Sequence, residues 1–162
     1  MSSGSTILDR LDRTPPWRFT GTLYAVRWLV IIPVALIIDR VFTGGKISGA
    51  NVGVMFWFGV LIVAPVFETL IECTLPYWIM RKLTFVRDDR RPWGFVITAA
   101  VMMTLLHIGA WPAAIIPSFV TGAFLGYTYG HFAPVGFRQA LLYTSIFHAC
   151  INLVGCILIA VG

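Results

Sequence analysis

The chain has 162 residues, of which 58% are hydrophobic and only 12% are charged, and its formal net charge is +5. Soluble domains carry about a quarter charged residues, so this composition excludes an ordinary water-soluble fold and indicates a membrane protein. The basic residues flank apolar runs, where they act as topology signals and face anionic lipid headgroups. This placement excludes a nucleic-acid partner. The three cysteines form no CxxC pair, so neither a disulfide framework nor a zinc knuckle is indicated.

The N-terminal segment, residues 1–21, has no early apolar stretch and no small-residue cleavage site, so it does not read as a removable signal peptide. Pro15 and Pro16 interrupt the segment. We therefore expect a cytoplasmic tail that is partly disordered or lies on the membrane surface. A single transmembrane domain is expected to follow over residues 22–162.

Apolar runs separated by polar or charged breaks predict an all-α, polytopic membrane bundle of about five transmembrane helices. The predicted helices span Thr22 to Asp39, Asn51 to Lys82, Trp93 to Ala110, Pro112 to His131 and Phe137 to Val161. The second is long for one crossing, roughly 48 Å, and contains Pro65 and Pro76. It is therefore expected to be kinked or tilted.

Basic residues are concentrated before the first predicted helix and in the loop "RKLTFVRDDRRPW" between the second and third. Arg40 and Lys46 follow the first predicted helix, and Arg138 lies between the fourth and fifth. The positive-inside rule makes the N-terminus and the basic loop cytoplasmic. The C-terminus of this multi-pass cell-membrane protein is then extracytoplasmic.

The fourth predicted helix carries Gly122, Gly126 and Gly130. Small residues at this four-residue spacing form a flat stripe along a helix and let another helix approach closely. The pattern therefore predicts a close helix–helix contact at this face.

Ionisable side chains inside a membrane span are costly and tend to mark a functional site or a buried pair. Counted from the predicted cytoplasmic helix ends, Glu68, His107 and His148 lie at roughly 16 to 21 Å, and Asn152 lies at roughly 22 Å. Residues four apart share a helix face, so His148 with Asn152, and Glu68 with Glu72, are expected to face one cavity. A lone histidine there usually serves interhelical hydrogen bonding, but packing alone does not need this whole set.

A glutamate and two histidines are able to hold a water molecule and remove its proton, and an asparagine amide is able to donate to a developing oxyanion. These roles together indicate hydrolysis of an amide. The same glutamate and histidines, Glu68, His107 and His148, are also a ligand set for a divalent metal such as Zn²⁺, which takes three protein ligands and one open position. The sequence leaves both alternatives open.

Three stretches, "FETLIEC", "MTLLHIGAWP" and "FHACINLVG", resemble the motifs of the CPBP (Abi) family of CAAX-processing and bacteriocin-processing intramembrane endopeptidases. The family patterns are EExxxR, FxxxH and HxxxN or HxxxB. The resemblance covers about residues 60–160 and implies a four-helix CPBP-like core. It also implies that Glu68 activates water with help from His107, while His148 and Asn152 support the water and an oxyanion.

This chain departs from the family pattern at three positions. Thr69 stands in place of the second glutamate, Cys73 in place of the arginine, and Met103 in place of the aromatic residue before the first histidine. An arginine at position 73 would pair with a carboxylate, so its replacement removes an electrostatic brace. Glu72, one turn from Glu68, is a possible substitute for the second carboxylate and otherwise lines the entrance of the cavity.

Two functions from different classes fit the sequence. One is an intramembrane endopeptidase that hydrolyses a peptide bond of a membrane-presented peptide or protein. The other is a non-catalytic subunit with the same fold, which acts as a scaffold or assembly factor for other membrane protein subunits. The altered first motif and the tryptophans near helix ends favour the second.

Overall fold

The computed structural model describes residues 14–41, 54–82, 93–108 and 114–161, and every regular element in these ranges is a helix. The first is α2, Pro16–Val41. A long helix follows, built from α3 (Val54–Phe58), the π-helical turn η1 (Gly59–Val63), α4 (Ala64–Thr69), the π-helical turn η2 (Leu70–Thr74) and α5 (Leu75–Lys82). The last three are α6 (Trp93–His107), α7 (Ile115–Phe132) and α8 (Phe137–Val161). The all-α prediction is confirmed for the described residues.

The helix boundaries differ from prediction mainly at the start of α2. That helix begins at Pro16, so residues 16–21, which were expected to belong to the tail, are helical. Proline suits the first helical position because its missing N–H has no intrahelical partner there. α8 has the predicted bounds, whereas α6 ends at His107 and α7 begins at Ile115. Parts of the predicted segments lie outside the described ranges: residues 1–13 of the tail, 83–92 of the basic loop, and 51–53 and 109–113 in or between the predicted helices.

The long helix departs from α-helical geometry just before each of its prolines. The N–H of Ala64, which precedes Pro65, donates to the carbonyl of Gly59, five residues back. The N–H of Leu75, which precedes Pro76, donates to the carbonyl of Leu70 in the same way. The prolines were expected to distort this helix, and the distortion takes the form of two π-helical turns, which are frequent at functional sites.

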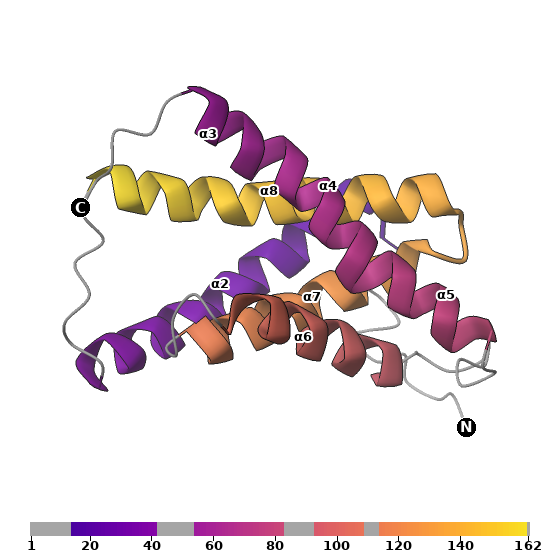
Figure 1. The fold of residues 1–162 in the computed structure, drawn as a ribbon, viewed down its shortest axis with the longest axis horizontal. Coiled ribbons are helices and arrows are strands. Elements are labelled where there is room, and N and C mark those ends of the chain that lie inside the picture. Colours follow the sequence, from indigo (N-terminus) through magenta and orange to yellow (C-terminus); the bar gives the residue numbers. More distant parts are fainter. Residues whose placement is uncertain (1–13, 42–53, 83–92, 109–113, 162) are drawn as a thin grey trace.

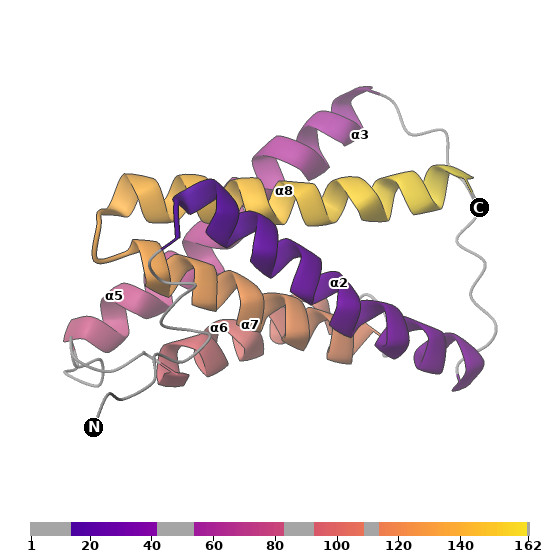
Figure 2. The same cartoon turned by 180° about the vertical axis from the view of Figure 1, so that it is seen from behind.

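The helices are arranged so that two of them cross the bundle on opposite faces. The long α3–α5 helix crosses α8 on the face seen in Figure 1, and α2 crosses α7 and α8 on the face seen in Figure 2. The end of α5 and the starts of α6 and α8 lie at the same end of the molecule in both views. α8 therefore meets side chains from both crossing helices.

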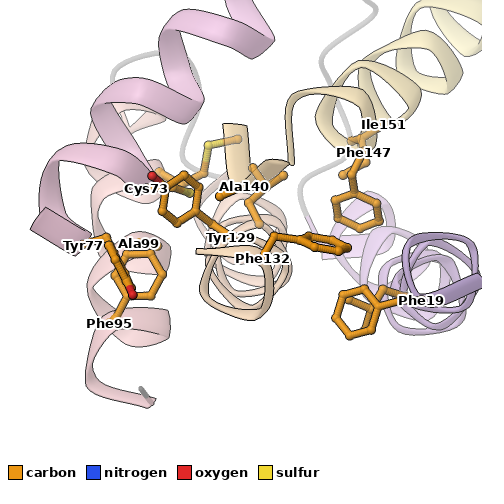
Figure 3. Close-up of a cluster of buried hydrophobic side chains, with 13 residues drawn as sticks. Phe19, Cys73, Tyr77, Phe95, Ala99, Tyr129, Phe132, Ala140, Phe147 and Ile151 are labelled. Carbon is orange, nitrogen blue, oxygen red and sulfur yellow. The ribbon is translucent and has the colours of Figure 1, made fainter. Parts of the chain in front are cut away.

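Aromatic side chains fill the interior at the end of the bundle where α8 begins. Tyr77, Phe95 and Tyr129 meet edge-on or tilted with ring centroids 5.3 to 6.0 Å apart, and they join α5, α6 and α7 (Figure 3). Phe19 of α2 packs edge-on against Phe132 of α7 at 5.5 Å. This cluster fixes the helices on one side of the polar residues described below.

The glycine stripe of α7 is the contact face for α6. A Cβ atom added at Gly122 would lie 2.6 Å from the Cβ of Met103 and 2.8 Å from the Cα of Ala100. At Gly126 it would lie 2.8 Å from the Cβ of Ala99. The predicted close approach is confirmed at these two glycines.

We expect Gly122→Ala to destabilise the fold by about 1 to 3 kcal/mol, because the added methyl group overlaps backbone as well as side-chain atoms of α6. The midpoint of thermal unfolding in detergent measures the effect. Gly155→Ala is the matched control, since a Cβ at that helical position meets nothing within 4 Å. Equal midpoints for the two variants would contradict the close packing of α6 on α7.

Candidate functional site

Three polar side chains lie on one face of α8 and contact the long α3–α5 helix. Ser145 donates from its hydroxyl to the carbonyl of Pro65 at 3.4 Å, and Asn152 donates from its amide to the carbonyl of Val60 at 3.0 Å. Between them, His148 meets Glu68. Positions 145, 148 and 152 lie on one face because residues three and four apart are neighbours on a helix. The polar stripe therefore joins α8 to the long helix along about two turns.

The central contact of the site joins Glu68 to His148. Nε2 of His148 lies 3.2 Å from Oε2 of Glu68, within reach of a hydrogen bond that the imidazole donates. The His148 side chain is buried, whereas 29% of the Glu68 side chain remains exposed. The predicted meeting of these two residues across two helices is thus present, and the carboxylate is open on one side.

His107, at the end of α6, is the third ionisable residue of the predicted site. It is close enough to Glu68 and His148 to interact with both electrostatically. Its Nδ1 lies 2.8 Å from the carbonyl oxygen of Met103. A carbonyl only accepts hydrogen bonds, so Nδ1 carries the proton and Nε2 is left with the lone pair. The ring is thereby held in the tautomer in which Nε2 is the basic nitrogen.

Glu72 is more completely buried than Glu68 and belongs to the second π-helical turn, η2. The residue is 0% exposed, and neither carboxylate oxygen has a hydrogen-bond partner in the described part of the chain. It interacts electrostatically with Glu68. Glu72 was expected either to support Glu68 or to line the entrance of the cavity, and its complete burial is inconsistent with an entrance position. Its supporting role stays a prediction.

We expect Glu72→Gln to leave the protein at least as stable as the wild type. The change replaces a buried carboxyl group that lacks hydrogen-bond partners with an uncharged amide of the same shape, which has no charged form to bury. Thermal unfolding in detergent is the measurement, with Glu68→Gln as a matched control on the same helix. A clear loss of stability in Glu72→Gln alone would mean that this carboxylate has a strong partner in the folded protein.

Asn152 makes a hydrogen bond to the backbone of the long helix, which its predicted role at an oxyanion did not include. In the π-helical turn η1, the N–H of Ala64 donates to Gly59, so the carbonyl of Val60 would next accept from residue 65. Residue 65 is proline and has no N–H to donate. The amide of Asn152 takes this place at 3.0 Å. Asn152 therefore satisfies a backbone carbonyl that Pro65 leaves without a helical partner.

Arg27 of α2 is absent from the predicted site residues, although a charged residue inside an apolar span is itself a signal. It is 5% exposed, and its Nη2 donates to Oγ1 of Thr121 in α7 at 3.0 Å. One turn earlier, Tyr24 donates from its hydroxyl to the carbonyl of Cys150 in α8 at 3.1 Å. The charge of Arg27 also acts on His148. The structure thus adds a buried cation from α2, a helix that contributes none of the predicted site residues.

A metal ion was the open alternative to a water held by protein groups alone. Among the described residues, no group of three or more His, Cys, Asp and Glu side chains is arranged to hold a metal ion. Glu68 and His148 contact each other directly, and His107 directs Nδ1 to its own helix. The three proposed ligands therefore do not form the set of three ligands around one open position that a catalytic zinc site requires.

Comparison with known proteins found no match among family models, curated proteins or solved structures.

Proposed function

We propose that this chain is a multi-pass membrane protein in which Glu68 and His148 activate a water molecule to hydrolyse a peptide bond of a membrane-presented substrate. The observation that carries the proposal is the contact between the partly exposed carboxylate of Glu68 and the buried imidazole of His148. The resemblance of "FETLIEC", "MTLLHIGAWP" and "FHACINLVG" to CPBP motifs agrees with it, because these stretches contribute Glu68, His107 and His148.

The surface of the bundle supports the membrane setting. Two helices are long and apolar enough to cross a membrane, Met55–Lys82 and Phe137–Ile157, and the helix Trp93–His107 is apolar but shorter. Large apolar side chains are exposed on all the main helices, among them Leu29, Met55, Phe67, Ile97 and Leu142. Apolar exposure of this extent is typical of a surface that faces lipid or a partner protein.

The distribution of tryptophan and basic residues supports the predicted orientation. Exposed tryptophans lie at the start of α2, near the end of α5 and at the start of α6: Trp17, Trp78 and Trp93. Arg18, Arg81 and Lys82 lie beside them in the sequence. Aromatic residues prefer the membrane–water interface, and basic residues prefer the cytoplasmic side. The proposal therefore keeps this end of the bundle in the cytoplasm.

In the proposed reaction, the Glu68 carboxylate accepts a proton from water while the resulting hydroxide forms a bond to the carbonyl carbon of the substrate. The electron pair of the carbonyl π bond moves to oxygen and gives a tetrahedral oxyanion. Its collapse restores the carbonyl and breaks the C–N bond, and the leaving amine takes the proton from Glu68. One water is consumed, and one acid and one amine are formed.

The histidines have separate roles in this reaction. His148 donates from Nε2 to Glu68 and orients that carboxylate, while the basic Nε2 of His107 orients the attacking water. The hydrogen bonds that fix each ring support these roles. Asn152 contributes by holding the opened turn of the long helix that precedes Glu68.

Accumulation of substrate in cells tests the proposal. Membranes of cells that express Glu68→Gln in place of the wild type are expected to contain an uncleaved protein, and the wild type is expected to convert it to two products. Quantitative mass spectrometry of new peptide termini measures both. Identical sets of termini in the two strains would contradict the protease.

A second candidate is a non-catalytic subunit that acts as a scaffold in a larger membrane assembly. It is favoured by the engagement of Asn152 with a backbone carbonyl, which is a structural use of a residue that the resemblance makes catalytic. This candidate predicts a stoichiometric complex that persists with Glu68→Ala. Purification of the protein from membranes distinguishes the two, since a protease holds its substrate only transiently.

A further inference from the structure

Arg27 lies on α2, the helix that crosses α8 on the face opposite the long helix of Glu68. The long helix crosses α8 on one face and α2 crosses on the other (Figures 1 and 2). On α2, the hydroxyl of Tyr24 donates to the carbonyl of Cys150, and its ring packs edge-on against Phe147, with centroids 6.1 Å apart. These contacts flank His148 on both sides in the sequence. Arg27, one turn beyond Tyr24, therefore shares the face of α2 that packs against this part of α8.

The guanidinium of Arg27 retains unused hydrogen-bonding capacity. Nη2 donates to Thr121, and the guanidinium carbon lies 4.7 Å from the ring centroid of Trp28. Nε and Nη1 are buried and have no hydrogen-bond partner in the part of the chain that the structure describes. A buried cation with free donors is costly unless an anion or a polar group meets it. The geometry therefore favours a ligand oxygen at Arg27.

The proposed hydrolysis requires a donor for the oxyanion, and one of the two N–H groups of the Asn152 amide is committed elsewhere. Its amide nitrogen donates to the carbonyl of Val60, which Pro65 leaves without its helical donor. Preorganised donors at the oxyanion are among the largest contributions to catalysis of acyl transfer. Arg27 has two such donor atoms, and it lies on the face of α2 that packs around His148 of α8 through Tyr24.

We propose that Arg27 is the oxyanion-binding residue of the Glu68–His148 site. Nε and Nη1 donate to a compact oxyanion, and Thr121 tethers the guanidinium by accepting from Nη2. The identity of the oxyanion, the tetrahedral intermediate of peptide hydrolysis, rests on the proposed function. Binding of an oxyanion as such does not, because it depends only on the buried guanidinium.

The depth of Arg27 disfavours a lipid headgroup as the source of the oxyanion. Arg27 lies roughly 16 Å along α2 from Pro16, and His148 lies roughly 16 Å along α8 from Phe137. Headgroups lie at the membrane surface, near the helix ends, because the hydrocarbon core alone is about 30 Å thick. A headgroup would have to leave the membrane surface to reach Arg27. An oxyanion formed on a substrate within the bundle is already at that depth.

Small oxyanions test this binding directly. The full chain, purified in an uncharged detergent, is titrated with acetate or inorganic phosphate at constant ionic strength against chloride, and the midpoint of thermal unfolding is recorded. The midpoint of the wild type is expected to rise with the oxyanion, and that of Glu68→Gln is expected to rise as well. Arg27→Gln is expected to bind at least about tenfold more weakly. The absence of a rise in the wild type, or an equal rise in Arg27→Gln, would overturn the proposal.

Arg18→Gln is the matched control, since it removes the same charge from an exposed position of the same helix and should bind oxyanion as the wild type does. Should Arg27→Gln fail to fold, Arg27→Lys takes its place. A compact ammonium does not reproduce the donors of a guanidinium, so affinity still falls several-fold. Unchanged affinity in Arg27→Lys would then overturn the proposal.

A kinetic measurement separates this proposal from the proposed function. On a peptide that the wild type cleaves, Arg27→Gln is expected to lower kcat by about 100-fold or more with little change in KM, because the oxyanion exists only in the transition state and intermediate. A rise in KM alone would overturn the role in stabilising the oxyanion. If the wild type cleaves no peptide but Arg27 still governs oxyanion binding, the protease fails and the oxyanion site stands.

Discussion

Glu68→Gln is expected to lower the rate of peptide hydrolysis by at least about 100-fold, while the protein remains folded and bound to its substrate. Glutamine keeps the shape of the side chain and an oxygen that accepts from Nε2 of His148, 3.2 Å from the carboxylate in the wild type. It lacks the basicity that removes a proton from water. The loss should therefore appear in kcat and not in KM.

The measurement uses the purified full chain and a peptide library, with products identified by mass spectrometry. Glu72→Gln is the matched comparison, because it makes the same chemical change one turn away on the same helix. If Glu72 supports Glu68 by sharing a proton or a water, its variant also loses activity while remaining folded, and unchanged activity would remove that role. Retention of wild-type activity by Glu68→Gln would end the hydrolytic model.

The sequence predicted the all-α class and the matched depth of Glu68 and His148 for physical reasons that the structure makes plain. A helix has a fixed rise per residue, so counting from helix ends placed Glu68 and His148 at one depth, and the two side chains meet at 3.2 Å. The glycine stripe predicted a close contact, and Gly122 and Gly126 have no room for a Cβ against α6. Depth and periodicity are local properties of a helix, which is why sequence is sufficient for them.

Other features depend on which helices become neighbours, and the sequence contains little information on that. Arg27 was not among the predicted site residues because nothing local indicates that α2 packs beside His148; the contacts of Tyr24 and Thr121 show it only in the folded chain. The burial of Glu72 depends likewise on how the second π-helical turn is oriented. The catalytic roles of these residues stay predictions.

The two prolines of the long helix were recognised as points of distortion, but the form of the distortion was not predicted. A proline removes one N–H, and sequence does not say which carbonyl is left open or what satisfies it. In the structure, the π-helical turn before Pro65 leaves the carbonyl of Val60 without a helical hydrogen-bond donor. The Asn152 side chain of α8 donates to it instead. A residue predicted for catalysis is thereby shown to make a structural contact between helices.

Asn152→Ala is accordingly expected to destabilise the fold by about 1 to 3 kcal/mol, because it leaves the carbonyl of Val60 without a hydrogen-bond donor. Unfolding of the full chain in detergent gives the free energy. The expected loss is specific to this carbonyl, since Ala64 donates to Gly59 and the donor that the π-helical pattern would next supply is missing because residue 65 is proline.

That dependence makes a double-mutant cycle with Pro65→Ala decisive. Alanine at position 65 restores an N–H that is able to donate to Val60 in the π-helical pattern, so the amide of Asn152 becomes redundant. Asn152→Ala is then expected to cost much less in the Pro65→Ala background than in the wild type, and the difference is the coupling between the two positions. Additive effects would contradict the assignment of Asn152 to the carbonyl that Pro65 leaves open.

The same pair of variants separates structure from catalysis at Asn152. If the asparagine acts only by holding the opened turn before Glu68, activity and stability should be restored together in Pro65→Ala/Asn152→Ala, measured against Pro65→Ala alone. If its amide also donates to the oxyanion, stability returns while kcat stays low. The first outcome is expected, because the bond to Val60 already orients the Asn152 amide toward the long helix, whereas two donors of the buried Arg27 guanidinium have no partner among the described residues.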